Sequence, residues 1–357
     1  MGTTAQKLQA TLNSKTAIKN ALIAKGVSQP GDRLSDYAGY INSLETPPTS
    51  LTFSGNIEQY AHYMQYGAKG TLAGAQTNTI GQVNARLTSV DCSEVTGVGI
   101  QSFGYAFVHC QNLSHIVLPS GALEYTSSSF SQAFKGTNPT GEITLDFSNE
   151  NINLNGSTYA NAFQETGGDF TFHIKFRPTV NEMAGSCFNY MFNNSTGLKS
   201  IRISGFKECL NRQQMNPGFG ASANYFLKGC TNLTNIEWPD LEVIGLNTST
   251  QYSRLHLVDI TNTSVRTMSL PKLKELRFIG SSSSTGLING ITTSAEFCDF
   301  ITDWYFPQLT LIGRYAFYGF KNTTIHFAAA NEAAVKSNTY YSSTFGAGSE
   351  TTMEFDL

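Results

Sequence analysis

Residues 101–327 repeat a pattern in which an apolar anchor precedes an apolar–polar–apolar triplet. In the clearest copy, Phe107 lies 11 residues before Leu118, the last residue of its triplet. The same offset separates Phe134 from Leu145, Phe163 from Ile174, Phe192 from Ile203 and Leu227 from Trp238. Successive anchors are 27, 29, 29 and 35 residues apart. Constant internal spacing with variable separation predicts one structural unit joined by loops of different length.

The triplets predict short strands with one buried face. In Ile201-Arg202-Ile203, for example, the apolar side chains alternate with a polar one, as in a half-buried strand. The anchor is expected on a short turn or helical piece between layers. Because no single unit can bury its anchor, the units should stack into a solenoid with one continuous core and a parallel sheet along one face.

Two further patterns extend the repeat. Looser copies place Phe317 and Phe345 ten residues before Phe327 and Phe355. An apolar-Pro-x-Leu element recurs at 238–241, 270–273 and 306–309.

Residues 1–46 follow a different, helical pattern. Apolar residues spaced by about one helical turn predict three short helices, with Leu8, Leu12, Ile18, Leu22, Tyr37 and Ile41 on their apolar sides. Helices this short cannot build a core of their own. We therefore expect an attachment or oligomerisation module, the alternative being a helical cap on the following domain.

These patterns together predict an α+β repeat protein. The helical module at 1–46 is followed by a linker at 47–50, which includes Pro47-Pro48. A β-rich solenoid then occupies 51–357, with one cap at 51–100, repeats at 101–327 and a C-terminal cap at 328–357.

Composition narrows the functional classes. Charged residues make up only 14% of the 357 residues and the net charge is −3, so nucleic-acid binding by a basic surface is not expected. With 40% hydrophobic residues, the chain has enough apolar material for a core. We expect no membrane insertion, because no run of 18 apolar residues occurs. The N-terminal residues show no signal peptide, which favours synthesis in a cytoplasm.

The residues that could carry catalysis form no recognisable motif. The six histidines are scattered, and His173 and His326 occupy the middle of strand triplets, so we expect both side chains on the sheet surface. The carboxylate pairs considered for glycan hydrolysis are Asp299 with Asp303 and Asp240 with Glu242. Neither pair lies in a known motif, so we expect no enzyme activity, no cofactor and no metal.

The six cysteines are Cys92, Cys110, Cys187, Cys209, Cys230 and Cys298. Their dispersed positions favour buried apolar roles over zinc binding or disulfides. Cys110 and Cys230 each follow an anchor by three residues, which predicts core positions for both.

Tyrosines provide a candidate recognition surface. Tyr60, Tyr63 and Tyr66 form one cluster, and Tyr340 with Tyr341 forms another. Tyrosine is favoured at binding surfaces because it offers large contact area at low entropic cost. Packing in the core or between subunits is the alternative interpretation.

The repeat resembles the BspA-type leucine-rich repeat. The motif I-G-x-x-A-F is best matched at 312–317, then within 102–121 and 224–245, and the period is broken at 246–300. The resemblance implies a curved solenoid that binds host or matrix proteins and has no common catalytic residues.

The two ends resemble phage tail or head fibre proteins. The segments concerned are 11–41 and 325–357, the latter including Ile325-His326-Phe327. This resemblance implies a homotrimeric virion surface protein, made in the host cytoplasm, that attaches to other virion proteins through its N-terminal helices and binds a bacterial surface receptor or glycan. A bacterial BspA-like surface adhesin is the main alternative. A glycan-degrading tailspike and a purely decorative virion protein are others.

Overall fold

The computed structural model divides the chain into two compact units, Met1–Pro48 and Thr49–Leu357. The structure describes residues 13, 16–17, 20, 49–57, 68–69, 82–83, 86–100, 102–120, 128–148, 157–177, 187–205, 207–209, 226–244, 258–259, 263–277, 288–289, 301–313, 317, 323–338 and 351–357. Among these residues no helix combines the length and the apolar character needed to cross a bilayer.

In the first unit the structure describes Asn13, Thr16, Ala17 and Asn20, all in helical conformation and exposed. The apolar residues that we assigned to attachment or oligomerisation lie outside the described residues. The predicted helical module therefore stays a prediction.

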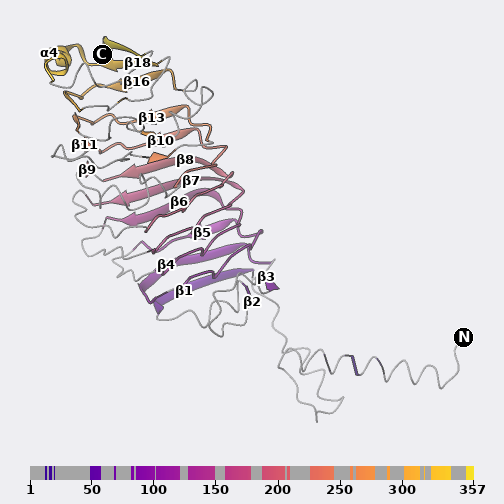
Figure 1. Ribbon diagram of the computed structural model, residues 1–357. Coiled ribbons are helices and arrows are strands. Elements are labelled where there is room, and N and C mark those ends of the chain that lie inside the picture. The colour runs from indigo at the N-terminus through magenta and orange to yellow at the C-terminus, as the bar shows by residue number, and fades with distance from the viewer. Residues whose placement is uncertain are drawn as a thin grey trace, which may run out of the picture. The chain divides into compact units, whose positions relative to one another are not determined.

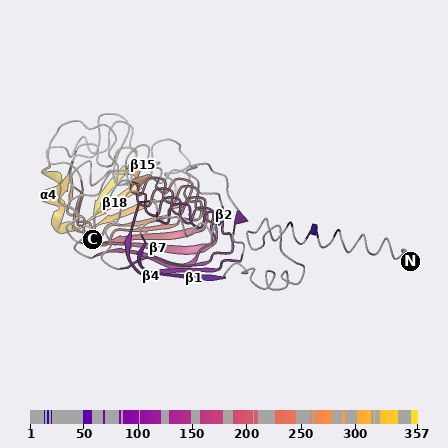
Figure 2. The ribbon, with the colours of Figure 1, turned by 90° about the horizontal axis from the view of Figure 1, so that it is seen from below.

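The described part of Thr49–Leu357 is dominated by short strands that stack in parallel (Figure 1). A first sheet contains β1 (Ser50–Ile57), β4 (Ser89–Val98) and β5 (His115–Val117). A second has the order β13 (Thr267–Ser269), β10 (Asn235–Glu237), β8 (Leu198–Ser204), β7 (Asp169–Phe176) and β6 (Thr140–Phe147). Viewed along the stack, β1, β4 and β7 lie over one another on one side of this unit (Figure 2).

Shorter strands complete the unit. A four-stranded sheet has the order β17 (Leu311–Ile312), β14 (Glu275–Leu276), β11 (Val243–Ile244) and β9 (Glu208–Cys209). Two pairs stand apart, parallel β12 (Val258–Asp259) with β15 (Ile288–Asn289) and antiparallel β2 (Ala68–Lys69) with β3 (Gln82–Val83).

The C-terminal end adds a parallel sheet with the order β16 (Asp303–Phe306), β18 (Thr323–Phe327) and β19 (Thr351–Phe355). Between β18 and β19 lie the 3-10 helix η4 (Ala329–Asn331) and the α-helix α4 (Glu332–Lys336). Val335 of α4 is buried. Within Thr49–Leu357, α4 is the one α-helix among the described residues.

The predicted apolar–polar alternation sets the register of the second sheet. Ile143, Phe172, Ile201, Ile236 and Met268 are cross-strand partners along one row. The first four are buried, and Met268 packs against the core from a partly buried position. The predicted parallel sheet is therefore confirmed for the triplets of these strands, whereas the triplet at 116–118 overlaps β5 of the first sheet.

The anchors lie on stacked turns, which settles the expectation of either a turn or a helical piece. The backbone N–H of Phe107, Phe134 and Phe163 donates to the carbonyl of the residue before the next anchor, at 2.8, 2.9 and 2.9 Å. The anchor rings stack in the same order, with centroids 5.4 Å apart for Phe107–Phe134 and 5.1 Å for Phe134–Phe163. Each such pair contributes about 0.5–1.5 kcal/mol beyond its area burial.

These turns need left-handed backbone on both sides of the anchor. Residues two before and two after an anchor have positive φ, as at Asn161 (56°) and Glu165 (58°) around Phe163. This conformation is uncommon for residues other than glycine. The sequence pattern did not indicate it, because among the described residues glycine fills these positions only at Gly136 and Gly229.

The prediction for the cysteines is confirmed for four of them. Cys92, Cys110, Cys187 and Cys230 are buried. Burial raises the pKa of Cys230 to about 12, so this thiol stays protonated and unreactive. The structure describes the backbone of Cys209 but not its burial, and Cys298 lies outside the described residues.

Candidate functional site

The polar positions of the second sheet form one continuous surface, which we call the outer face. Thr144, His173, Arg202, Glu237 and Ser269 are cross-strand partners along its central row. The rows on either side complete it, and the outer face consists of Glu142, Thr144, Asp146, Thr171, His173, Lys175, Ser200, Arg202, Ser204, Asn235, Glu237, Thr267 and Ser269. All these side chains are half-buried or exposed.

The side chains of the outer face contact one another across the strands. Arg202 Nη1 lies 3.6 Å from Glu237 Oε2, and Lys175 Nζ lies 3.7 Å from Asp146 Oδ2. His173 Nε2 is 2.7 Å from Ser204 Oγ. The outer face therefore presents donors and acceptors held in a fixed register.

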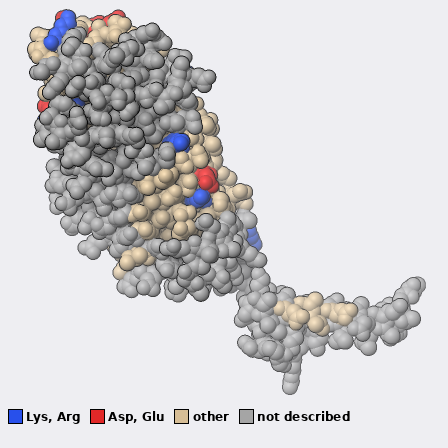
Figure 3. Space-filling model, in the orientation of Figure 1, with Lys and Arg blue, Asp and Glu red and all other residues tan. Residues whose placement is uncertain are grey.

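The outer face carries charges of both signs, with three carboxylates and two cations. Partial burial, together with Lys175 and Arg202, lowers the pKa of His173, so its imidazole is neutral near pH 7. Figure 3 shows another side of the molecule, where the described surface carries few charged side chains and both signs occur. An outer face of mixed charge suits hydrogen-bonded recognition better than long-range charge steering.

Asp240 and Glu242, one of the two carboxylate pairs considered for hydrolysis, are held by lysines. Asp240 accepts a 2.7 Å hydrogen bond from Lys272 and a 2.9 Å bond from the Gly205 backbone N–H. Glu242 lies 2.7 Å from Lys274 and 3.8 Å from Lys207. These lysines lower the pKa of both carboxyls, whereas a glycosidase acid needs a raised pKa.

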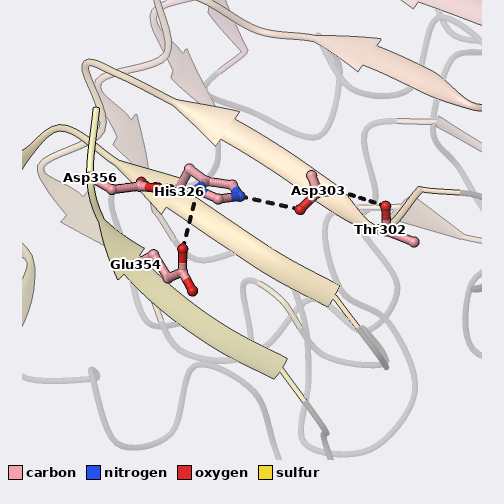
Figure 4. Close-up of polar contacts among 5 residues, drawn as sticks. All are labelled: Thr302, Asp303, His326, Glu354 and Asp356. Atoms are coloured by element: carbon pink, nitrogen blue, oxygen red, sulfur yellow. Dashed lines mark hydrogen bonds and ion pairs between the residues drawn. The ribbon is translucent and has the colours of Figure 1, made fainter.

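A second polar site lies on the C-terminal sheet around His326, and we call it the His326 cluster (Figure 4). His326 Nδ1 lies 2.9 Å from Asp356 Oδ1 and 3.8 Å from Glu354 Oε2. On the other side of the ring, Nε2 lies 3.3 Å from Asp303 Oδ1. Asp303 in turn accepts a 2.6 Å hydrogen bond from Thr302. Strands β16, β18 and β19, with the residue that follows β19, thus bring one imidazole and three carboxylates together.

The imidazole of His326 lies on the polar side of its sheet, as expected, in one row with Tyr305 and Glu354. Neighbouring side chains nevertheless cover most of it. Its side chain keeps 11% of its exposure, because the ring of Tyr305 stacks on it with centroids 4.7 Å apart. Burial opposes the charge of His326, but hydrogen bonds to Asp356 and Asp303 outweigh it and raise its pKa. The carboxyl of Asp303 has a lowered pKa, chiefly through Thr302 and then His326.

The tyrosines proposed for recognition, Tyr60, Tyr63, Tyr66, Tyr340 and Tyr341, lie outside the described residues. Asp299 lies outside them as well. Its suggested partner Asp303 belongs to the His326 cluster. The sequence reasoning missed that cluster, since its signal was only a histidine in the middle of a strand triplet.

Comparison with known families gives one assignment. The BspA type leucine rich repeat region, with six copies, matches residues 84–204, 185–284 and 230–345. The chain belongs to this family. No curated protein and no solved structure matches the chain. The matched residues include β6–β8 and their anchors. They also include the pair β12 and β15, although that pair lies in the segment where the sequence period is broken.

Proposed function

We propose that this BspA-type repeat protein is an adhesin-like binding protein that recognises its target through the outer face. The observation that supports this most directly is the unbroken polar surface of five parallel strands in register. Strand neighbours lie about 4.8 Å apart, so the surface offers polar groups at short, regular intervals over a rigid core.

The chemistry of the outer face favours a hydroxyl-rich ligand such as a bacterial surface glycan. Asn235 donates a 2.8 Å hydrogen bond to Glu237 and accepts a 2.7 Å bond from Thr267. Such a network fixes the side chains before the ligand arrives, which lowers the entropy cost of binding. Arg202 is half-exposed beside it and can donate to ligand oxygens.

The proposed setting is the surface of a phage particle. In this proposal residues 1–46 attach the protein to other virion proteins and join three copies, and the solenoid binds the bacterial receptor. What supports it is the resemblance of the two chain ends to fibre proteins. A bacterial surface adhesin would use the same outer face.

Arg202→Ala tests the role of the outer face, with Lys336→Ala as a matched control. Both cations are about half-exposed, at 52% and 51%, and each pairs with one glutamate. We expect Arg202→Ala to weaken binding of labelled protein to target bacteria by about tenfold or more, as for loss of a charged hydrogen bond. Lys336→Ala should bind as the wild type does. Equal binding by the two variants would contradict recognition through the outer face.

The proposed location on the surface of a phage particle is tested by a separate experiment. Mass spectrometry and gold-labelled antibody on purified phage particles should detect it at the particle surface. Detection on bacterial cell surfaces in cultures free of phage would favour the bacterial adhesin instead.

A further inference from the structure

We propose that the His326 cluster is a binding site for a divalent transition metal ion of the Zn²⁺ type. Its ligands would be His326 through Nδ1, Glu354 and Asp356. One ligand atom from each lies within 4.8 Å of the others. Two of these residues are direct cross-strand partners, since His326 pairs with Glu354 in the register of β18 and β19.

The two ring nitrogens of His326 face different groups, as they do at known metal sites. Nδ1 faces Asp356 and Glu354, whereas Nε2 faces Asp303 at 3.3 Å. A histidine that binds a metal through one nitrogen commonly donates its other N–H to a carboxylate, which fixes the tautomer and the ring orientation. Asp303 is therefore a positioning residue, itself held by the hydroxyl of Thr302.

A second observation is that a neighbouring aromatic ring holds the imidazole of His326 in place. Tyr305 stacks on its face with an interplanar angle of 11°, so the ring cannot turn freely away from β19. The carboxylates of Glu354 and Asp356 are about half-exposed, at 49% and 48%. A rigid imidazole between carboxylates that can adjust would allow metal–ligand distances of about 2.0–2.2 Å.

The donor set selects the class of ion. One imidazole nitrogen with two carboxylates suits Zn²⁺ or a similar transition metal, whereas Ca²⁺ and Mg²⁺ prefer oxygen ligands alone. Three protein ligands leave a fourth, solvent-facing position for water or a ligand oxygen. The ion would fasten β19 and the residue after it, which supply Glu354 and Asp356, to β18.

The competing state is a protonated His326 surrounded by carboxylates. The charged groups facing the ring are Asp303 on β16, Glu354 on β19 and Asp356 directly after β19, next to the phenol ring of Tyr305. Because the metal needs a neutral imidazole, a proton at Nδ1 competes with it. Zn²⁺ affinity is therefore expected to fall as the pH falls from 8 to 6.

Isothermal titration of the full-length, tag-free protein with Zn²⁺ at pH 7.5, after treatment with a chelator, tests the proposal. We expect one site per chain and no comparable binding of Ca²⁺ or Mg²⁺. His326→Ala and the double variant Glu354→Gln with Asp356→Asn should lose this site. Co²⁺ in place of Zn²⁺ should give the visible absorption of a site with nitrogen and oxygen ligands, lost in the same variants.

Two further variants test whether Asp303 positions His326 and whether the loss of any histidine weakens Zn²⁺ binding. Asp303→Asn should keep the stoichiometry but weaken Zn²⁺ binding by about 10–100-fold, as for loss of a carboxylate behind a ligating histidine. His173→Ala removes a histidine from the outer face and should bind Zn²⁺ as the wild type does.

The proposal is overturned if the wild type shows no single site, or if the site persists in the double variant. If His326→Ala does not fold, the double variant decides the question, because both its positions are exposed. The result is independent of the Arg202 experiment, since the outer face and the His326 cluster lie on different sheets.

Discussion

At the scale of single residues, the electrostatic environment of His326 links its charge to stability. The folded protein favours the imidazolium, because Asp356 and Asp303 accept its hydrogen bonds and raise its pKa above 6.5. The resulting stabilisation is complete below the pKa of the unfolded chain, about 6.5, and is lost as the pH rises through the folded pKa.

We therefore expect His326→Gln to destabilise the metal-free protein more at pH 5.5 than at pH 8.5. The difference at pH 5.5 should be about 1 kcal/mol, the scale of a partly exposed ion pair. Urea unfolding in the presence of a chelator at both pH values measures it. Below about pH 4 the difference should shrink again, since Asp303 and Asp356 become protonated. A difference that grows toward pH 8.5 would contradict the charged state.

Individual residues also show where sequence reasoning reached its limit. The core roles of Cys110 and Cys230 were predictable, since both follow an anchor by three residues. The burial of His326 was not, because Asp303 and Asp356 are 23 and 30 residues away in sequence. Only the register of β16, β18 and β19 brings them together, and loop lengths did not indicate that register.

At the scale of elements, the anchor turns carry much of the stability. Phe163 is fully buried and stacks between Phe134 and Phe192, with centroids 5.1 and 5.9 Å away. It also meets Phe172 of β7 edge-on at 5.1 Å. One side chain thus joins two neighbouring turns to the sheet.

We expect Phe163→Ala to reduce the free energy of unfolding by about 3–5 kcal/mol, as for other buried phenylalanines. Phe163→Leu should cost less, because it leaves a smaller cavity. Because repeats contact mainly their neighbours, Phe163→Ala should also split the thermal transition into two steps in calorimetry. An unchanged single transition at the wild-type temperature would contradict this role of the anchor.

The elements were predictable to different degrees. The strand triplets and their parallel pairing follow from the alternation of apolar and polar residues, as in Ile201-Arg202-Ile203. The turns were predicted only as a choice between turn and helix, because positive φ at residues such as Gln132 and Tyr190 has no local signal in their side chains. It is imposed by backbone hydrogen bonds to the next repeat.

At the scale of the whole molecule, the division after Pro48 predicts that the second unit folds alone. A fragment comprising residues 49–357 should keep a thermal midpoint within a few degrees of the full chain and retain target binding. By light scattering we expect a trimer for the full chain and a monomer for the fragment. An unfolded fragment would mean that residues 1–46 act as a cap. A fragment that stays trimeric would place oligomerisation in the solenoid.

The direction of the hydrogen bonds in the stack has a mechanical consequence. Both the strand ladders and the anchor turns bond each repeat to the next, so tension applied along the stack loads these bonds a few at a time, as in a zipper. Repeats would detach singly from an end, each releasing roughly 100 Å of chain for its 27–35 residues. A protein that tethers a particle to a cell would thus extend under drag before it dissociates from its target.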